Sequence, residues 1–103
     1  MWAQLIRTRL KPGHEGDLSR LMAELQTVEQ PGSGLVRSLA MKDQKDPSEV
    51  YMLVVFESEE KARARENDPR REEGLQAARA MMAEAFDSAP QFTDLVVVEE
   101  LAP

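Results

Sequence analysis

Residues 34–66 have the sequence GLVRSLAMKDQKDPSEVYMLVVFESEEKARARE, and this stretch decides the fold. It predicts two strands, over residues 35–42 and 49–57, joined by a polar turn and followed directly by a helix. The second strand is apolar at every position from Val50 to Phe56. An antiparallel strand with one wet face alternates apolar and polar residues, so this strand is expected to be covered on both faces.

The composition limits the class of protein. The chain has 103 residues, 42% hydrophobic and 31% charged, which is typical of one soluble globular domain. Its net charge of −6 argues against partners that attract basic proteins, so neither nucleic acid nor a membrane is expected. There is no cysteine, which excludes disulfides and cysteine-ligated metals. No membrane-spanning run or signal-peptide pattern is present, so a cytoplasmic location is expected.

The first third of the chain predicts a strand and an amphipathic helix. Residues 2–10 predict the strand, which ends at Lys11-Pro12-Gly13. Alternation places on one of its faces Trp2, Gln4, Ile6, Thr8 and Leu10. Residues 14–29 predict the helix, which the turn at residues 31–34 ends. Its apolar stripe consists of Leu18, Leu21, Met22, Leu25 and Val28.

The last third predicts a broken helix and a fourth strand. Ser58 is a good N-cap for a helix over residues 59–66. A second helical segment then begins at Pro69, which suits the first helical position, with Asp68 as its cap. Its apolar stripe consists of Leu75, Ala78, Met82, Ala85 and Phe86. Residues 91–99 predict the last strand.

The predicted order is β-α-β-β-α-β, which is the ferredoxin-like α+β arrangement. Its four-stranded antiparallel sheet carries the helices on one face. The other face should then expose the apolar side chains of Leu53, Val55, Leu95 and Val97, or of their neighbours of opposite parity. Such a patch is unusual on a monomer. We therefore expect a homodimer formed through the open sheet face.

Three stretches also point to a known family. Arg9 to Glu15 resembles a first strand that ends in Lys-Pro-Gly, and residues 31–34 resemble the turn before the second strand. Tyr51 to Ala62 resembles a strand-to-helix junction. In these stretches the chain resembles the antibiotic biosynthesis monooxygenase (ABM) domain family, part of the dimeric α/β-barrel superfamily, over nearly its whole length. The motifs specify architecture rather than catalytic residues.

The resemblance implies a homodimer whose sheets form a barrel, with a pocket in each subunit between sheet and helices. Some members of the family oxygenate aromatic substrates without metal or flavin, and others degrade haem. The haem-degrading branch uses an Asn on the first strand, and a Trp and a His around the second helix. The matching positions here are Ile6, Arg65 and Leu75. Haem chemistry is therefore not expected, and we expect no cofactor.

Candidate ligand-binding residues follow from this implied pocket. The Trp2 face of the first strand forms either a pocket floor or ordinary core. Gln4 and Thr8 favour the pocket, because a buried amide or hydroxyl needs a partner. Tyr51 either hydrogen-bonds a phenolic or quinone-like substrate or lies at the sheet edge in water. The full candidate set is Trp2, Gln4, Ile6, Thr8, Tyr51, Arg65, Met82 and Phe86.

Two further features are candidates for chemistry. His14 is the only histidine and is expected on an exposed turn, so a histidine-based metal site is not expected and no catalytic residue is assigned. A basic cluster surrounds the helix break and consists of Arg63, Arg65, Asn67, Arg70 and Arg71. It is either the mouth of an anion site or, because glutamates are interleaved with it, a salt-bridged surface.

The leading functional hypothesis is a cofactor-independent monooxygenase-like protein that acts on a small aromatic or quinone-type molecule between sheet and helices. The first alternative is a non-catalytic homodimeric binding or stress-response module of the same fold. The second is a purely structural subunit, in which Trp2, Met82 and Phe86 close the pocket.

Overall fold

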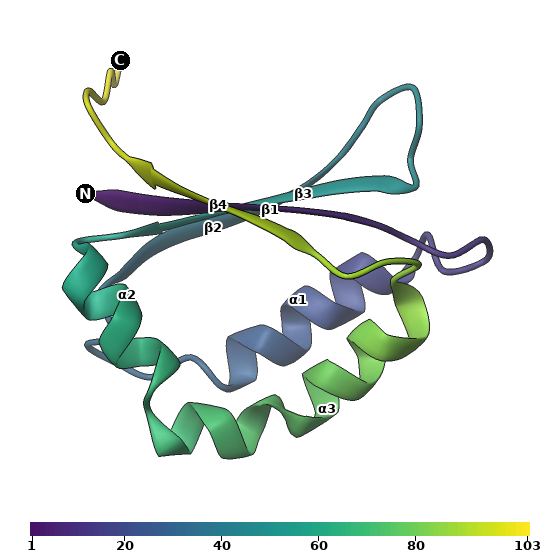
Figure 1. Cartoon of the computed structure of the whole chain (residues 1–103), viewed down its shortest axis with the longest axis horizontal. Helices are drawn as coiled ribbons and strands as arrows, with labels where there is room; N and C mark the ends of the chain where they lie inside the picture. The colour runs from purple at the N-terminus through teal and green to yellow at the C-terminus, as the bar shows by residue number, and fades with distance from the viewer.

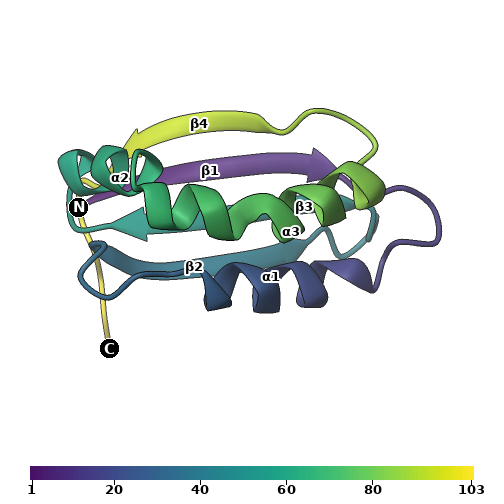
Figure 2. The ribbon, with the colours of Figure 1, turned by 90° about the horizontal axis from the view of Figure 1, so that it is seen from below.

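The chain forms one antiparallel sheet with all its helices on one face (Figure 1). The computed structural model describes residues 1–103. The elements in chain order are β1 (Trp2–Arg9), α1 (Asp17–Thr27), β2 (Leu35–Lys42), β3 (Glu49–Phe56), α2 (Glu59–Glu66), α3 (Pro69–Ala85) and β4 (Gln91–Val96). Figure 2 shows the strand order β2-β3-β1-β4, which confirms the ferredoxin-like prediction. None of the helices has the length and apolar character that crossing a membrane requires.

The helix break falls where the capping residues predict it. The Ser58 side chain accepts a hydrogen bond from the Lys61 backbone N–H at 3.2 Å, which satisfies one free donor of α2. Asp68 does the same for the Arg70 N–H of α3 at 2.9 Å, and Pro69 occupies the first turn. Helices α2 and α3 therefore run in different directions under the sheet instead of forming one continuous helix (Figure 1).

Several predicted ends differ from the structure. The last strand ends at Val96 instead of residue 99, because Val96 pairs with Trp2, the first residue of its only neighbour, β1. The first helix spans Asp17–Thr27 instead of residues 14–29, and His14 lies in the turn before it. The first and third strands each end one residue earlier than predicted, at Arg9 and Phe56.

Phe86 is also not helical, although the sequence places it on the helical stripe. It is the C-cap of α3 with an extended backbone (φ −92°, ψ 133°), and it forms an isolated bridge with Leu10. Its side chain is nevertheless buried, because the bridge ties the end of α3 to the end of β1. The stripe therefore identified a core residue correctly but assigned it the wrong backbone.

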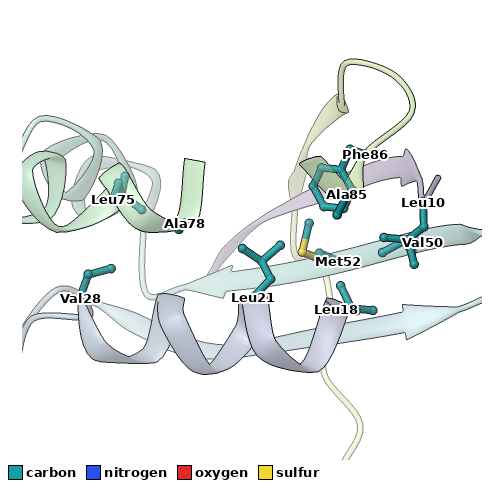
Figure 3. Packing of buried hydrophobic residues seen from close by; sticks show 10 residues of the cluster. All are labelled: Leu10, Leu18, Leu21, Val28, Val50, Met52, Leu75, Ala78, Ala85 and Phe86. Atoms are coloured by element: carbon teal, nitrogen blue, oxygen red, sulfur yellow. The ribbon is translucent and has the colours of Figure 1, made fainter. Parts of the chain in front are cut away.

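The main core fills the space between the sheet and helices α1 and α3. Figure 3 shows its ten buried members, which are Leu10, Leu18, Leu21, Val28, Val50, Met52, Leu75, Ala78, Ala85 and Phe86. Val50 and Leu10 are its most completely buried large side chains. A smaller cluster under α2 consists of Trp2, Phe56 and Ala62. The sheet and helices thus bury one apolar layer between them.

The opposite face of the sheet has no helix over it (Figure 1), and its centre is apolar with Arg7 and Arg37 beside it. Val50, Met52 and Phe56 of β3 point toward the helices, so the alternate residues Leu53 and Val55 point away. The register pairs Leu53 with Leu5 of β1 and Leu39 of β2, and it pairs Val55 with Ala3 of β1 and Arg37 of β2. We call this surface the open face, and its apolar residues are Ala3, Leu5, Leu39, Met41, Leu53, Val55 and Leu95. Val97, which the sequence also placed there, lies beyond β4.

A glycine sets the spacing of the two long helices. A Cβ added to Gly74 of α3 would lie 2.5 Å from Val28 Cγ1 and 3.0 Å from Val28 Cβ, at the end of α1. Gly74→Ala should therefore destabilise the fold by about 1–2 kcal/mol, because overpacking outweighs the gain of roughly 1 kcal/mol in helix propensity. Urea unfolding measures this. In the Val28→Ala background the same substitution should cost less, and an equal cost in both backgrounds would contradict the contact.

Candidate functional site

The register separates the candidate residues into groups. The β1 residues Trp2, Gln4, Ile6 and Thr8 share the face that looks toward the helices, and Met82 and Phe86 of the α3 region lie on that side. Tyr51 is on the open face, since it alternates with the buried Val50 and Met52. The structure therefore does not bring Tyr51 together with the other candidates.

Gln4 belongs to a polar network at the edge of the sheet. Its Nε2 donates to Asp94 Oδ1 at 3.0 Å, across the β1–β4 pair. Arg63 of α2 donates to the other carboxylate oxygen of Asp94, also at 3.0 Å. The guanidinium of Arg63 also lies over the Trp2 ring, 5.0 Å from its centroid. Strand β4, strand β1 and helix α2 thus meet through three polar side chains.

The hydrogen bonds of this network shift the pKa values of Asp94 and Arg63. The hydrogen bond from Gln4 lowers the pKa of the Asp94 carboxyl, and the bond from Arg63 adds to this effect. The bond to Asp94 in turn raises the pKa of Arg63, which also pairs with Glu59 and Glu66. Asp94 is therefore an anion at neutral pH and a weak proton acceptor.

Two exposed apolar residues lie beside this network. Phe92 and Val96 share the face of Asp94 on β4, opposite Ile6 and Trp2, and they are 60% and 77% exposed. The helices do not cover β4, so these side chains face solvent although they point to the helix side. We call the surface formed by Gln4, Ile6, Arg63, Phe92, Asp94 and Val96 the helix-side strip.

Sequence reasoning missed three residues of this strip, which are Phe92, Asp94 and Val96. Their spacing of two residues was a visible signal that they share one face. The sequence did not show which face, because that depends on the pairing of β4 with β1 in the register of Trp2 with Val96.

Two other β1 candidates, Trp2 and Thr8, are buried by their neighbours. Trp2 is 6% exposed and packs against Phe56 with the ring centroids 6.0 Å apart. Thr8 is 4% exposed, and its hydroxyl donates to the Ser88 carbonyl at 3.2 Å. Thr8 lines a cavity of about 250 Å³ with Arg7, Arg9, Glu49, Ser88, Ala89 and Gln91. In this structure its hydroxyl has a partner within the chain.

Arg65 and Tyr51 have partners of their own. Arg65 binds Glu29 through Nε and Nη2, with a shortest distance of 2.7 Å, and its guanidinium lies 5.2 Å from the centroid of Phe56. On the open face, the Arg7 guanidinium lies 5.7 Å from the centroid of Tyr51. Arg65 thus ties α2 to the turn after α1, where Glu29 lies.

His14 lies near the start of α1, away from the strip. Its Nδ1 is 2.7 Å from Asp17 Oδ2, on the first turn of the helix. No three histidine, cysteine, aspartate or glutamate side chains gather closely enough to form a metal-ligand set. The chemistry of the strip therefore rests on hydrogen bonding, on one paired carboxylate and on apolar contact.

This architecture is that of the ABM proteins. Solved structures with that name match nearly the whole chain, and the likeness confirms the resemblance at the level of the fold. A candidate antibiotic biosynthesis monooxygenase from Nitrosomonas europaea has a TM-score of 0.75 and 12% identity, over 96% of this chain and 100% of that one. No family model and no curated protein matches the sequence.

Two further structures show the functional range within this fold. A variant of SnoaB, a cofactor-independent oxygenase from Streptomyces nogalater, has a TM-score of 0.74 and 14% identity, over 99% of this chain and 97% of that one. NE2512 from Nitrosomonas europaea, a protein of unknown function, has a TM-score of 0.71 and 24% identity, over 99% of this chain and 93% of that one. The fold is therefore shared by an oxygenase and by a protein without an assigned activity.

The Glu29–Arg65 pair gives a pH-dependent prediction. Burial raises the pKa of Glu29, but the hydrogen bonds from Arg65 and Ser33 outweigh it, so the pKa is lowered overall. Because the pKa of Glu29 is lower in the folded chain than its unfolded value of about 4.3, ionised Glu29 stabilises the fold at pH values above the unfolded pKa. This contribution to the free energy of unfolding is lost as the pH falls through the folded pKa. Glu29→Gln should cost about 1–3 kcal/mol at pH 7, and less at acidic pH.

Urea unfolding at a series of pH values measures this difference. Glu59→Gln is the matched control, because Glu59 pairs with Arg63 at the surface, where such pairs contribute little. Equal losses for the two variants, or a Glu29→Gln loss that does not change with pH, would contradict the structural role of the pair.

Proposed function

We propose that the chain is a cofactor-independent monooxygenase-like enzyme that acts, as a homodimer, on a small aromatic or quinone-type molecule held against the helix-side strip. The fold that it shares with SnoaB supports the reaction class. The observation that carries the proposal is the strip itself, where exposed apolar surface at Phe92 and Val96 adjoins the polar pair of Gln4 and Asp94.

The strip suits a flat molecule with hydroxyl groups. Phe92 and Val96 offer apolar contact for a ring, and aromatic rings favour stacked or edge-on contact with a phenylalanine. Gln4 donates to Asp94 through one N–H, so its carbonyl oxygen can accept a hydrogen bond from a substrate hydroxyl. The Asp94 carboxylate has further acceptor sites beyond the two that Gln4 and Arg63 use.

The weak basicity of Asp94 narrows the substrate class. Because its pKa is lowered, it does not readily take a proton from a ring hydroxyl. The substrate must therefore ionise through its own acidity, as polyhydroxylated aromatic rings do. The resulting anion supplies the electrons to O₂. At an activated ring CH₂, one oxygen atom enters the product as a carbonyl and the other leaves as water, so no external reductant is needed.

The open face supports the proposed homodimer. This apolar surface carries Leu39, Met41 and Leu95 at 46%, 40% and 38% exposure in one chain. The C-terminal tail leaves β4 toward the same side of the sheet, away from the helices (Figure 1). Its Val98 and Leu101 are almost fully exposed. A second sheet packed on this face would bury these groups. The expected cytoplasmic location stays a prediction.

A non-catalytic binding module is the second candidate, and the charges of the strip favour it. Asp94 and Arg63 are paired with one another, so neither is a free acid or base. His14 is held by Asp17 elsewhere in the chain. In such a module the same strip would retain an aromatic ligand without consuming oxygen.

Oxygen consumption separates these candidates. Chelator-treated, flavin-free protein should consume O₂ with hydroxylated aromatic compounds at a rate above that of the compounds alone. Gln4→Leu and Asp94→Asn should each lower kcat/KM at least tenfold, since each removes a hydrogen bond that orients the substrate. Gln76→Leu and Asp87→Asn make the same chemical changes at exposed positions outside the strip and should have no effect.

Each result of this comparison has one interpretation. If the protein binds a ligand without oxygen uptake, and Gln4→Leu weakens that binding, the result would favour the binding module over the enzyme. Turnover that Gln4→Leu and Asp94→Asn leave unchanged would remove the strip from the mechanism.

The dimer is tested by a charge placed on the open face. Leu53→Glu should convert a dimer to a monomer in size-exclusion chromatography with light scattering, because a carboxylate would be buried without a partner. Leu39→Glu repeats the test at a position already exposed in a single chain, so folding is preserved. Gln76→Glu adds the same charge on α3 and should remain dimeric. If both open-face variants remain dimeric, the interface lies elsewhere.

A further inference from the structure

A cavity of about 150 Å³ lies outside the helix-side strip, between the turn after α1 and the junction of α2 with α3. Its charged lining comes from four cations, Lys61, Arg65, Arg70 and Arg71, and two carboxylates, Glu29 and Asp68. The lining therefore has two surplus positive charges. This local excess of cations contrasts with the net charge of −6 of the whole chain.

Three of the four cations have a partner within the chain. Arg65 pairs with Glu29 at 2.7 Å, and Arg70 pairs with Asp68 at 2.8 Å. Lys61 pairs with Glu57 on the rim. The salt-bridged surface that the interleaved glutamates suggest is therefore real for these three residues.

Arg71 is the exception. It forms no ion pair, and its Nε atom is buried without a hydrogen-bond partner. Burial lowers the pKa of Arg71, and the nearby Arg65 cation lowers it further, while Glu29 and Glu66 act in the opposite direction. Arginine remains charged in proteins, and a buried donor without a partner costs stability. The local carboxylates do not meet this need, because Glu29 and Asp68 are engaged by Arg65 and Arg70.

We propose that this cavity is a binding site for a phosphate-type oxyanion, with the Arg71 guanidinium as its main ligand. Arg71 is the one lining cation without an ion pair in the chain, and guanidinium binds phosphate through paired hydrogen bonds. Lys61 and Arg70 lie on the lining and add electrostatic attraction. The anion is either free phosphate or the phosphate group of a larger metabolite.

Calorimetric titration tests the site, in phosphate- and sulfate-free buffer at constant ionic strength. Inorganic phosphate should bind saturably, and it should raise the melting temperature of the protein. Arg71→Gln should weaken phosphate binding at least tenfold. Arg79→Gln is the matched control, because it removes the same charge from the same helix at an exposed residue that pairs with Glu72 and does not line the cavity. It should change the affinity less than twofold.

Two additions keep the test decisive. Should Arg71→Gln fail to fold, Lys61→Gln at the rim should still weaken phosphate binding several-fold. A titration with glycerol 3-phosphate compares the two sources of the anion, since tighter binding of the ester indicates a larger metabolite and weaker binding indicates free phosphate. No saturable binding of either probe to the wild type, or equal losses in Arg71→Gln and Arg79→Gln, would overturn the proposal.

Discussion

The structure depends on a sheet that is apolar on both faces and covered by helices on only one. Strand β3 lies inside the sheet, between β2 and β1, and it has no polar residue from Val50 to Phe56. One set of its side chains builds the core against α1 and α3. The other set belongs to the open face. The helices of one chain cover only the first set, and in the proposed homodimer a second sheet would cover the other.

The helix break positions the candidate site. Because Asp68 and Pro69 end α2 and start α3 in a new direction, α2 can cover Trp2 and Phe56 while α3 packs on α1. Arg63 of α2 is thereby brought over the Trp2 ring and within hydrogen-bond distance of Asp94. The same break leaves the cavity that Arg71 lines. Both the helix-side strip and this cavity therefore depend on the break between α2 and α3.

Local sequence signals predicted the positions of most helices and strands. Features that depend on the pairing of distant strands could not be predicted from them. The strand at residues 35–42 and the break at Pro69 were predicted correctly, because alternation, capping residues and proline act over a few residues. The end of β4 was wrong because it depends on where β1 begins. Phe92 and Asp94 were missed for the same reason, since their face is set by the register with β1. Tyr51 was grouped with residues of the opposite face because a strand without polar residues gives no sign of which face is which.

Native mass spectrometry of the freshly purified wild-type protein tests the central claim most directly. The account predicts a complex with twice the 11.6 kDa mass of the chain, stable on dilution through the micromolar range. A monomer at these concentrations would contradict it, because the apolar residues of the open face would then be stable in water without a partner.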